Sequence, residues 1–224
     1  MEKRYVLFDL DGTLTDSYDG IINGLKYCLS RFTVEPKPDT FRKIIGPPIT
    51  WSLQNYYGFD DENAKLGLKY FREYYETGGY LENKVYSGVE DMLGILRGHD
   101  KKLMLATSKP QKMAERVLEH FGLADYFCFI AGVTVDSDLT NPSVKPRKSK
   151  EDVIEYVLKA NGIFDPENAV MVGDRSWDIK AGKMFGLQTV GVSYGYASAG
   201  ELEEAGADYI ADSPVKAARF IVQQ

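Results

Sequence analysis

The sequence has few of the residues that mark disulfide scaffolds, zinc sites or membrane spans. Its 224 residues include two cysteines, Cys28 and Cys128, which are too few for a disulfide framework and show no metal-ligand spacing. No stretch approaches the roughly 20 apolar residues of a membrane helix, and Asp9 and Asp11 interrupt the first apolar run, which excludes a signal-peptide core. We therefore expect a soluble, cytoplasmic protein with no membrane partner.

Basic residues are outnumbered by acidic ones. Lys and Arg number 27 against 33 Asp and Glu, which gives a formal net charge of -6. Such a surface repels a phosphate backbone, so we expect no nucleic-acid partner. The 44% of hydrophobic residues and 27% of charged residues are typical of a globular protein and exclude a disordered chain or a rod. The length fits one large domain, or one domain that carries a smaller one.

Short apolar runs alternate with helical patterns along most of the chain. Four of them have the length of strands and end in polar or glycine-rich residues: 5–8, 103–106, 169–172 and 189–192. Continuous apolar runs of this length are typical of strands buried on both faces of a parallel sheet. Residues 127–133 and 209–211 are weaker candidates. The alternation predicts an α/β fold with a doubly wound, Rossmann-like parallel sheet.

One region breaks the alternation. Residues 17–82 show only helical periodicity, which Gly46-Pro47-Pro48 interrupts as a rigid turn. We expect this region to form a small all-helical cap inserted after the first strand, and residues 1–16 and 83–224 to form the α/β core. Gly46-Pro47-Pro48 is our candidate for a loop that contacts the substrate, with an ordinary turn between helices as the alternative.

The first strand ends in a pair of carboxylates. Asp9 and Asp11 lie two residues apart, so that in extended backbone both side chains share a face at the carboxyl end of the strand. Doubly wound sheets bind their ligands at this end. Two neighbouring carboxylates repel each other unless a cation lies between them or one holds a proton, and both solutions suit phosphate chemistry. Gly12 then allows a sharp turn, with Thr13 at the bend.

Two later runs end in matching polar residues. Thr107 and Ser108 follow the second run with hydroxyls that can donate to a phosphoryl oxygen, and Asp174 and Asp178 follow the third with carboxylates. Each has an ordinary alternative as a helix cap or a turn. Because they lie in register on successive strands, together they predict one site at the edge of the sheet.

These motifs resemble those of the haloacid dehalogenase-like hydrolase superfamily. The segment from Asp9 to Thr13 is similar to its first motif, Thr107-Ser108 to its second and residues 173–178 to its fourth. Their order and spacing match over essentially the whole chain, and the helical insertion is similar to that superfamily's helical cap. Within the superfamily the chain resembles phosphoglycolate phosphatase-like enzymes and a 5'-nucleotidase-like branch.

The resemblance implies a role for each acidic residue. Asp9 would be the nucleophile that forms an aspartyl-phosphate, and Asp11 the general acid and then the general base. A dehalogenase needs no proton donor at Asp11, so its presence indicates phosphoryl transfer. Asp9, Asp174 and the backbone carbonyl of Asp11 would hold Mg²⁺, with Asp178 behind them or as an alternate ligand.

The third motif of the superfamily is a lysine that neutralises the phosphate and the nucleophile, and here this sequence departs from the usual Lys-Pro-x-Pro pattern. Lys145, Lys148 and Lys150 are the candidates. Ser149 followed by Asp152 is a variant of the capping box, which predicts that a helix begins at Lys150. We therefore rank Lys150 first, Lys148 second and Lys145 third. The resemblance implies that the phosphate is bound by the following residues: Thr107, Ser108, Gly12, Lys150 and Lys148.

We predict a magnesium-dependent phosphatase that hydrolyses a small phosphorylated metabolite and is most similar to phosphoglycolate phosphatase. The alternatives are a 5'-nucleotidase acting on nucleoside monophosphates and a β-phosphoglucomutase-like phosphotransferase. Outside enzymes, the alternative is a non-catalytic binding protein with the same fold, whose usual signature is the loss of Asp9, Asp11 or Asp174; all three are present. The choice among phosphate esters, and between a monomer and a homodimer, stays open from sequence.

Overall fold

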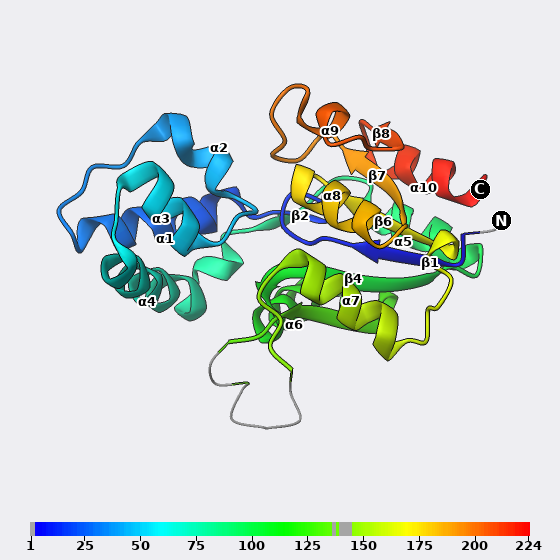
Figure 1. Ribbon diagram of the computed structural model, residues 1–224, viewed down its shortest axis with the longest axis horizontal. Coiled ribbons are helices and arrows are strands. Elements are labelled where there is room, and N and C mark those ends of the chain that lie inside the picture. The colour runs from blue at the N-terminus through cyan, green and yellow to red at the C-terminus, as the bar shows by residue number, and fades with distance from the viewer. Residues whose placement is uncertain (1–2, 136–137, 139–144) are drawn as a thin grey trace. The chain divides into compact units, whose positions relative to one another are not determined.

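The computed structural model describes residues 3–135, 138 and 145–224 (Figure 1). The chain divides into two compact units, one formed by residues 1–15 with 85–224 and the other by residues 16–84. Within the described part of the chain, no helix combines the length and the apolar character that crossing a membrane requires.

The first unit is built on a sheet of six parallel strands in the order β5-β4-β1-β6-β7-β8. Their bounds are Tyr5–Phe8 (β1), Lys102–Pro110 (β4), Phe129–Val133 (β5), Ala169–Gly173 (β6), Gln188–Val192 (β7) and Tyr209–Ala211 (β8). The four strong apolar runs and the two weaker ones thus all contain strands, and the doubly wound parallel fold class is confirmed.

Helices cover the sheet on both faces (Figure 1). Leu7, Met104 and Met171 belong to the core on one face, together with buried residues of α7 (Lys150–Ala160) and α8 (Ser176–Met184). The helices α5 (Val89–Gly98) and α10 (Pro214–Val222) pack against each other on the opposite face. The remaining helices of this unit are α6 (Gln111–His120) and α9 (Glu201–Glu204). Strands covered on both sides need apolar residues at every position, which explains their unbroken apolar runs.

The strand order indicates at which edge of the sheet a ligand would bind. Strands β4 and β5 lie on one side of β1, whereas β6, β7 and β8 lie on the other. The strand order therefore reverses beside β1, and ligands of doubly wound sheets bind at the carboxyl ends of the strands at such a point. Asp9 directly follows β1, Thr107 lies near the end of β4 and Asp174 directly follows β6.

The regular structure of the second unit is helical apart from its two end residues, Asp16 and Lys84. These belong to a two-stranded ribbon of β2 (Thr15–Asp16) and β3 (Lys84–Val85). Its helices are α1 (Tyr18–Ser30), α2 (Phe41–Ile44), α3 (Ile49–Tyr57) and α4 (Asp61–Thr77), with short 3-10 turns at Pro38–Thr40 (η1) and Gly79–Leu81 (η2). Helix α4 packs against both α1 and α3. Gly46-Pro47-Pro48 directly precedes α3, and its contact with a substrate stays a prediction.

Candidate active site

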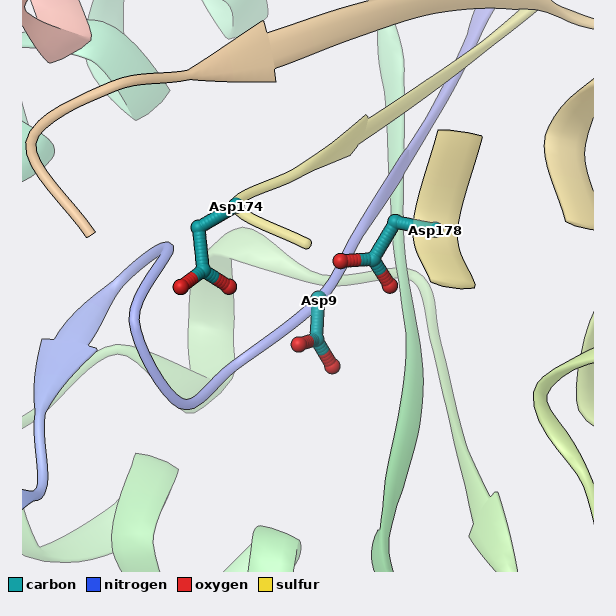
Figure 2. Close-up of side chains that lie close together, drawn as sticks. All are labelled: Asp9, Asp174 and Asp178. Atoms are coloured by element: carbon teal, nitrogen blue, oxygen red, sulfur yellow. The ribbon is translucent and has the colours of Figure 1, made fainter. Parts of the chain in front are cut away.

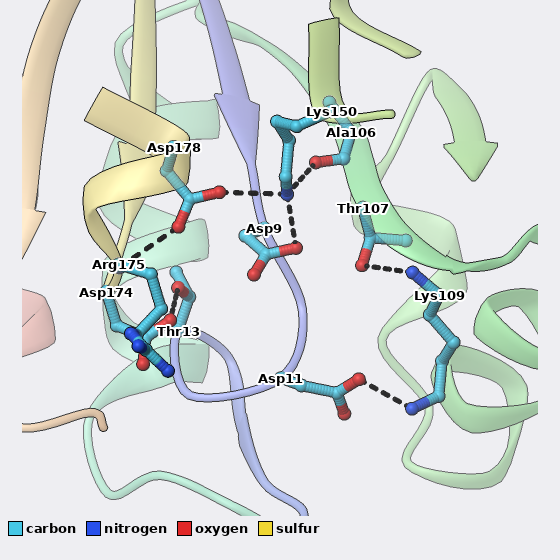
Figure 3. A network of polar contacts seen from close by, with 10 residues as sticks. All are labelled: Asp9, Asp11, Thr13, Ala106, Thr107, Lys109, Lys150, Asp174, Arg175 and Asp178. Atoms are coloured by element: carbon cyan, nitrogen blue, oxygen red, sulfur yellow. Dashed lines mark hydrogen bonds and ion pairs between the residues drawn. The ribbon is translucent and has the colours of Figure 1, made fainter. Parts of the chain in front are cut away.

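A lysine and two carboxylates form the centre of the site (Figure 3). Lys150 Nζ donates to Oδ1 of Asp9 at 2.7 Å and to the carbonyl oxygen of Ala106 at 2.9 Å. The same Nζ lies 2.9 Å from Oδ1 of Asp178. The ammonium group thus donates two hydrogen bonds and forms an ion pair with a third oxygen. These side chains are almost completely buried, since 4% of Lys150, 9% of Asp9 and 2% of Asp178 is exposed.

A helix cap places Lys150. The Ser149 side chain accepts a hydrogen bond from the backbone N–H of Asp152, and the Asp152 carboxylate accepts one from the backbone N–H of Ser149. This capping box begins α7 at Lys150, as the sequence predicts. Lys148 and Lys145 are exposed, so of these three lysines, all of them described, Lys150 is the one in contact with Asp9.

Asp174 completes a cluster of three buried carboxylates with Asp9 and Asp178 (Figure 2). One carboxylate oxygen from each lies within 4.8 Å of the others. Oδ2 of Asp174 accepts a hydrogen bond of 2.7 Å from the backbone N–H of Tyr196. A Cβ atom on Gly12, whose φ is +86°, would lie 2.1 Å from the same oxygen. The turn after β1 can therefore close against Asp174 only with glycine at this position.

The charges of this cluster act strongly on one another. Burial raises the pKa of Asp174, and the carboxylates of Asp178 and Asp9 raise it further. Burial also raises the pKa of Asp178 to about 6, although the ammonium of Lys150 opposes the change. Burial alone would lower the pKa of Lys150, but the charges of Asp178 and Asp9 outweigh it, so this pKa is raised and the lysine stays protonated.

The predicted hydroxyl groups lie on β4. Thr107 is buried and follows Ala106, whose carbonyl oxygen binds Lys150, while Ser108 is half-buried at the next position. Oγ1 of Thr107 accepts a hydrogen bond of 3.2 Å from the backbone N–H of Lys109. These contacts place Thr107 beside the lysine and nucleophile at the predicted edge of the sheet.

Asp11 contacts a lysine that sequence reasoning missed. Lys109 Nζ donates to Oδ2 of Asp11 at 2.6 Å, and the two side chains are 5% and 13% exposed (Figure 3). The sequence indicates chemistry for the hydroxyls of Thr107-Ser108 but none for Lys109. Regular alternation would place Lys109 on the face of Thr107, but it does not predict the contact with Asp11, because β4 shifts register between Thr107 and Pro110.

The loop after β7 was also missed. Its Tyr196 binds Asp174 through the backbone, as described, and its Tyr194 donates from the hydroxyl to the carbonyl oxygen of Thr13 at 2.9 Å. A Cβ atom on Gly195 would lie 2.4 Å from Cβ of Asp174. This loop follows a fourth strand at the same carboxyl edge, so the rule used for the other three strands could have included it.

Comparison with known proteins identifies relatives over most of the chain. A family described as haloacid dehalogenase-like hydrolase matches residues 6–192. A 5'-nucleotidase from Pseudomonas aeruginosa is 35% identical over 88% of this chain and 86% of its own length. A phosphoglycolate phosphatase from Chromobacterium violaceum is 31% identical over 94% of this chain and 92% of its own length.

Two further similarities extend the range of relatives. The tyrosine-protein kinase PtkA from Mycobacterium tuberculosis is 36% identical over 88% of this chain, which spans 64% of the kinase's length. The crystal structure of a predicted phosphatase from Clostridium acetobutylicum is 40% identical, covers 100% of both chains and superposes with a TM-score of 0.91. Relatives with this fold thus carry names from more than one phosphoryl-transfer reaction.

Proposed function

This chain belongs to the haloacid dehalogenase-like hydrolases, and we propose that it is a magnesium-dependent phosphatase that hydrolyses small phosphate monoesters through a phosphorylated Asp9. The contact of buried Lys150 with Asp9 and Asp178, beside Asp174, carries the proposal. Burying charges is costly even when they are paired, so such a cluster is poorly explained by stability alone. Buried carboxylates with raised pKa values at a ligand-binding edge are typical of catalytic sites.

The donor set fits a magnesium ion. Asp9, Asp174 and Asp178 offer hard carboxylate oxygens within one small volume, and Mg²⁺ prefers one or two carboxylates together with a substrate phosphate. The positive charge of Lys150 already pairs with the carboxylates of Asp9 and Asp178. Among these described residues, Asp174 has no such contact with Lys150, so its carboxylate has the greatest need of a cation. We propose that Asp9, Asp174 and the backbone carbonyl of Asp11 hold the ion, with Asp178 behind them. When bound, the ion would neutralise the phosphoryl oxygens that a carboxylate nucleophile must approach.

The first chemical step uses Asp9 and Asp11. A carboxylate oxygen of Asp9 attacks phosphorus, the bond between phosphorus and the ester oxygen breaks, and an aspartyl-phosphate forms. Asp11 gives a proton to the departing oxygen, so that an alcohol leaves. Lys150, Thr107 and Ser108 would bind phosphoryl oxygens, and the charge of Lys150 becomes more favourable as negative charge spreads over them in the transition state.

The second step consumes water. Asp11, now a carboxylate, takes a proton from a water molecule as the water oxygen attacks phosphorus. The acyl-phosphate bond breaks, Asp9 is restored as a carboxylate, and inorganic phosphate leaves. Asp11 is again protonated, now with a proton from water, so one turnover uses one ester and one water.

Two substrate classes have specific support. Relatives named 5'-nucleotidase and phosphoglycolate phosphatase both match most of this chain, at 35% and 31% identity. We propose phosphoglycolate and nucleoside monophosphates as the substrates to be compared first. We propose that the helical unit selects between them, with Gly46-Pro47-Pro48 as the candidate loop.

Release of inorganic phosphate tests the proposal. The purified chain with Mg²⁺ is assayed on phosphoglycolate, nucleoside monophosphates and sugar phosphates, beside the Asp9→Asn variant. We expect wild type to release phosphate from at least one class. When the phosphate group of that substrate is labelled, acid-quenched protein should carry the label on Asp9. Turnover of no ester would contradict hydrolysis, and isomerisation of a sugar phosphate without phosphate release would identify a phosphotransferase instead.

A further inference from the structure

Lys109 is a second buried lysine at the proposed site, separate from the one that contacts the nucleophile. Lys150 pairs with Asp9 and Asp178, whereas Lys109 pairs with Asp11 at 2.6 Å. Each of the two aspartates of the first motif thus has its own ammonium partner. The arrangement is visible in Figure 3, where the two lysines approach from different positions on β4 and α7.

An irregularity in β4 positions Lys109. Thr107 pairs with Gly132 of β5, but the next pair is Pro110 with Val133, so the register shifts between them and Ser108 and Lys109 fall in a bulge. Bulges redirect side chains and occur often beside active sites. A Cβ atom on Gly132 would lie 2.3 Å from the carbonyl oxygen of Lys109. The absence of a side chain on the neighbouring strand therefore lets this bulge form.

The two carboxylate oxygens of Asp11 differ. Oδ2 binds Lys109, whereas Oδ1 is buried and has no hydrogen-bond partner among the described residues. A buried carboxylate oxygen without a partner is unfavourable, because its desolvation is not offset. Such an atom at a ligand-binding edge is the one expected to form a hydrogen bond with the substrate or with the attacking water.

We propose that Lys109 is a positioning residue that holds Asp11 through Oδ2, so that Oδ1 is the oxygen that exchanges a proton with the leaving group and then with water. This inference rests on the proposed function, in which Asp11 is the general acid and base. The proton moves from Oδ1 to the ester oxygen as the bond from that oxygen to phosphorus breaks. In the second step the water proton returns to Oδ1, while Lys109 keeps its contact with Oδ2 throughout.

The alternative role for Lys109 is direct binding of the substrate, and the two roles predict different kinetics. A lysine that orients the acid matters most when the leaving oxygen needs a proton, and it has no effect once Asp11 cannot supply one. A lysine that binds the substrate lowers turnover of every ester and raises KM whether or not Asp11 can transfer a proton.

The experiment compares Lys109→Met with wild type on phenyl phosphate and p-nitrophenyl phosphate, which present similar rings but leaving groups of different basicity. Misplacing a catalytic group by about 1 Å can cost roughly 100-fold, so we expect kcat/KM on phenyl phosphate, which covers the steps up to departure of the alcohol, to fall by about 10- to 100-fold. On p-nitrophenyl phosphate the fall should be clearly smaller, and KM should stay close to the wild-type value on both. Lys109→Gln keeps a hydrogen-bond donor on a side chain that is one bond shorter and uncharged. It should retain more activity on phenyl phosphate than Lys109→Met, and it replaces that variant in the experiment if Lys109→Met does not fold.

A double-mutant cycle with Asp11→Asn decides between the roles. The amide keeps an acceptor for Lys109 but cannot transfer a proton, so Lys109→Met should cause no further loss in that background. Additive losses, or equal losses on both esters with a raised KM, would overturn the positioning role. Full activity of Asp11→Asn on phenyl phosphate would instead contradict the acid-base assignment itself. Lys183→Met is the matched control. Lys183 lies on α8 and forms a half-exposed ion pair with Asp208, so its loss removes an equal charge and should leave the kinetics unchanged.

Discussion

The two compact units bury different kinds of side chain. In residues 16–84, all of which the structure describes, the buried polar side chains are Ser17, Thr40 and Ser52, and none of the buried side chains carries a charge. The described residues of the other unit bury eight charged side chains: Asp9, Lys101, Lys109, Arg147, Lys150, Asp174, Arg175 and Asp178. A buried charge is costly even when paired, so the buried charges that gather at the carboxyl edge of the sheet, Asp9, Lys150, Asp174 and Asp178, are poorly explained by stability.

This difference shows in which unit the buried residues indicate function. In the α/β unit a buried aspartate is a departure from the pattern of the core, and each departure here lies near the carboxyl ends of β1 and β6. In the helical unit the buried positions follow ordinary amphipathic periodicity, as Ile22, Leu25 and Leu29 do along α1. That pattern explains the fold of the unit but does not indicate which substrate binds.

The largest expected effect tests whether the buried charges serve chemistry. Asp9→Asn keeps the size of the side chain and an acceptor for Lys150 Nζ, but an amide does not attack phosphorus. We expect turnover to fall by several orders of magnitude, as for loss of other nucleophiles. Circular dichroism and thermal unfolding should show a folded protein. Activity above about a tenth of wild type would remove Asp9 from the role of nucleophile.

Removal of the cation should have the next largest effect. Excess chelator should abolish phosphate release, and Mg²⁺ should restore it. Because an ion that binds only the folded state stabilises it, saturation at about 100 times Kd should add roughly 2.7 kcal/mol and raise the unfolding midpoint by about 5–10 °C. The shift is measured by calorimetry and does not depend on activity.

Asp174→Asn sharpens this test of the cation. The variant should lose most of the Mg²⁺-dependent shift, while in chelator it should unfold at a higher temperature than wild type, because one of three mutually repelling carboxylates is gone. Asp212→Asn is the control, since Asp212 is an exposed partner of Lys216. An equal Mg²⁺ shift in wild type and Asp174→Asn would contradict the proposed ligand set.

The lysines of residues 145–150 should differ by a smaller factor. Lys150 is buried against Asp9 and Asp178, whereas Lys148 is exposed and screened by water. We expect Lys150→Ala to lower kcat/KM at least about tenfold more than Lys148→Ala, which corresponds to roughly 1.4 kcal/mol of transition-state stabilisation. Steady-state kinetics on one ester measures the difference. Similar losses in both variants would mean that the contact with Asp9 contributes little to the reaction.

Much of this site could be predicted because its signals are local. Apolar runs gave β1 and β6, the carboxylates follow them directly, and the capping box of Ser149 with Asp152 determines where α7 begins. Lys109 was not predicted to contact Asp11, because that contact depends on a register shift between β4 and β5, and pairing between distant segments leaves no local pattern. The backbone bond from Tyr196 to Asp174 depends on a loop geometry that is equally non-local.

Substitutions that act on stability alone sharpen the contrast at the helical unit, where packing rather than charge should dominate. Gly20 of α1 donates its backbone N–H to the carbonyl oxygen of Glu82, and a Cβ atom there would lie 2.1 Å from the carbonyl oxygen of Gly79 in η2. No change of side-chain rotamer can relieve this clash, because a Cβ atom is fixed by the backbone and the opposing atom is itself a backbone oxygen. We expect Gly20→Ala to destabilise the protein by about 1–3 kcal/mol, as other overpacked sites do, and to lower the unfolding midpoint by roughly 2–4 °C for each kcal/mol.

The same substitution at Gly94 of α5 meets no atom within 4 Å, so the better helix propensity of alanine should stabilise the protein by about 1 kcal/mol. Opposite shifts in calorimetry would establish that close backbone approach holds η2 against α1, and shifts of the same sign would refute it.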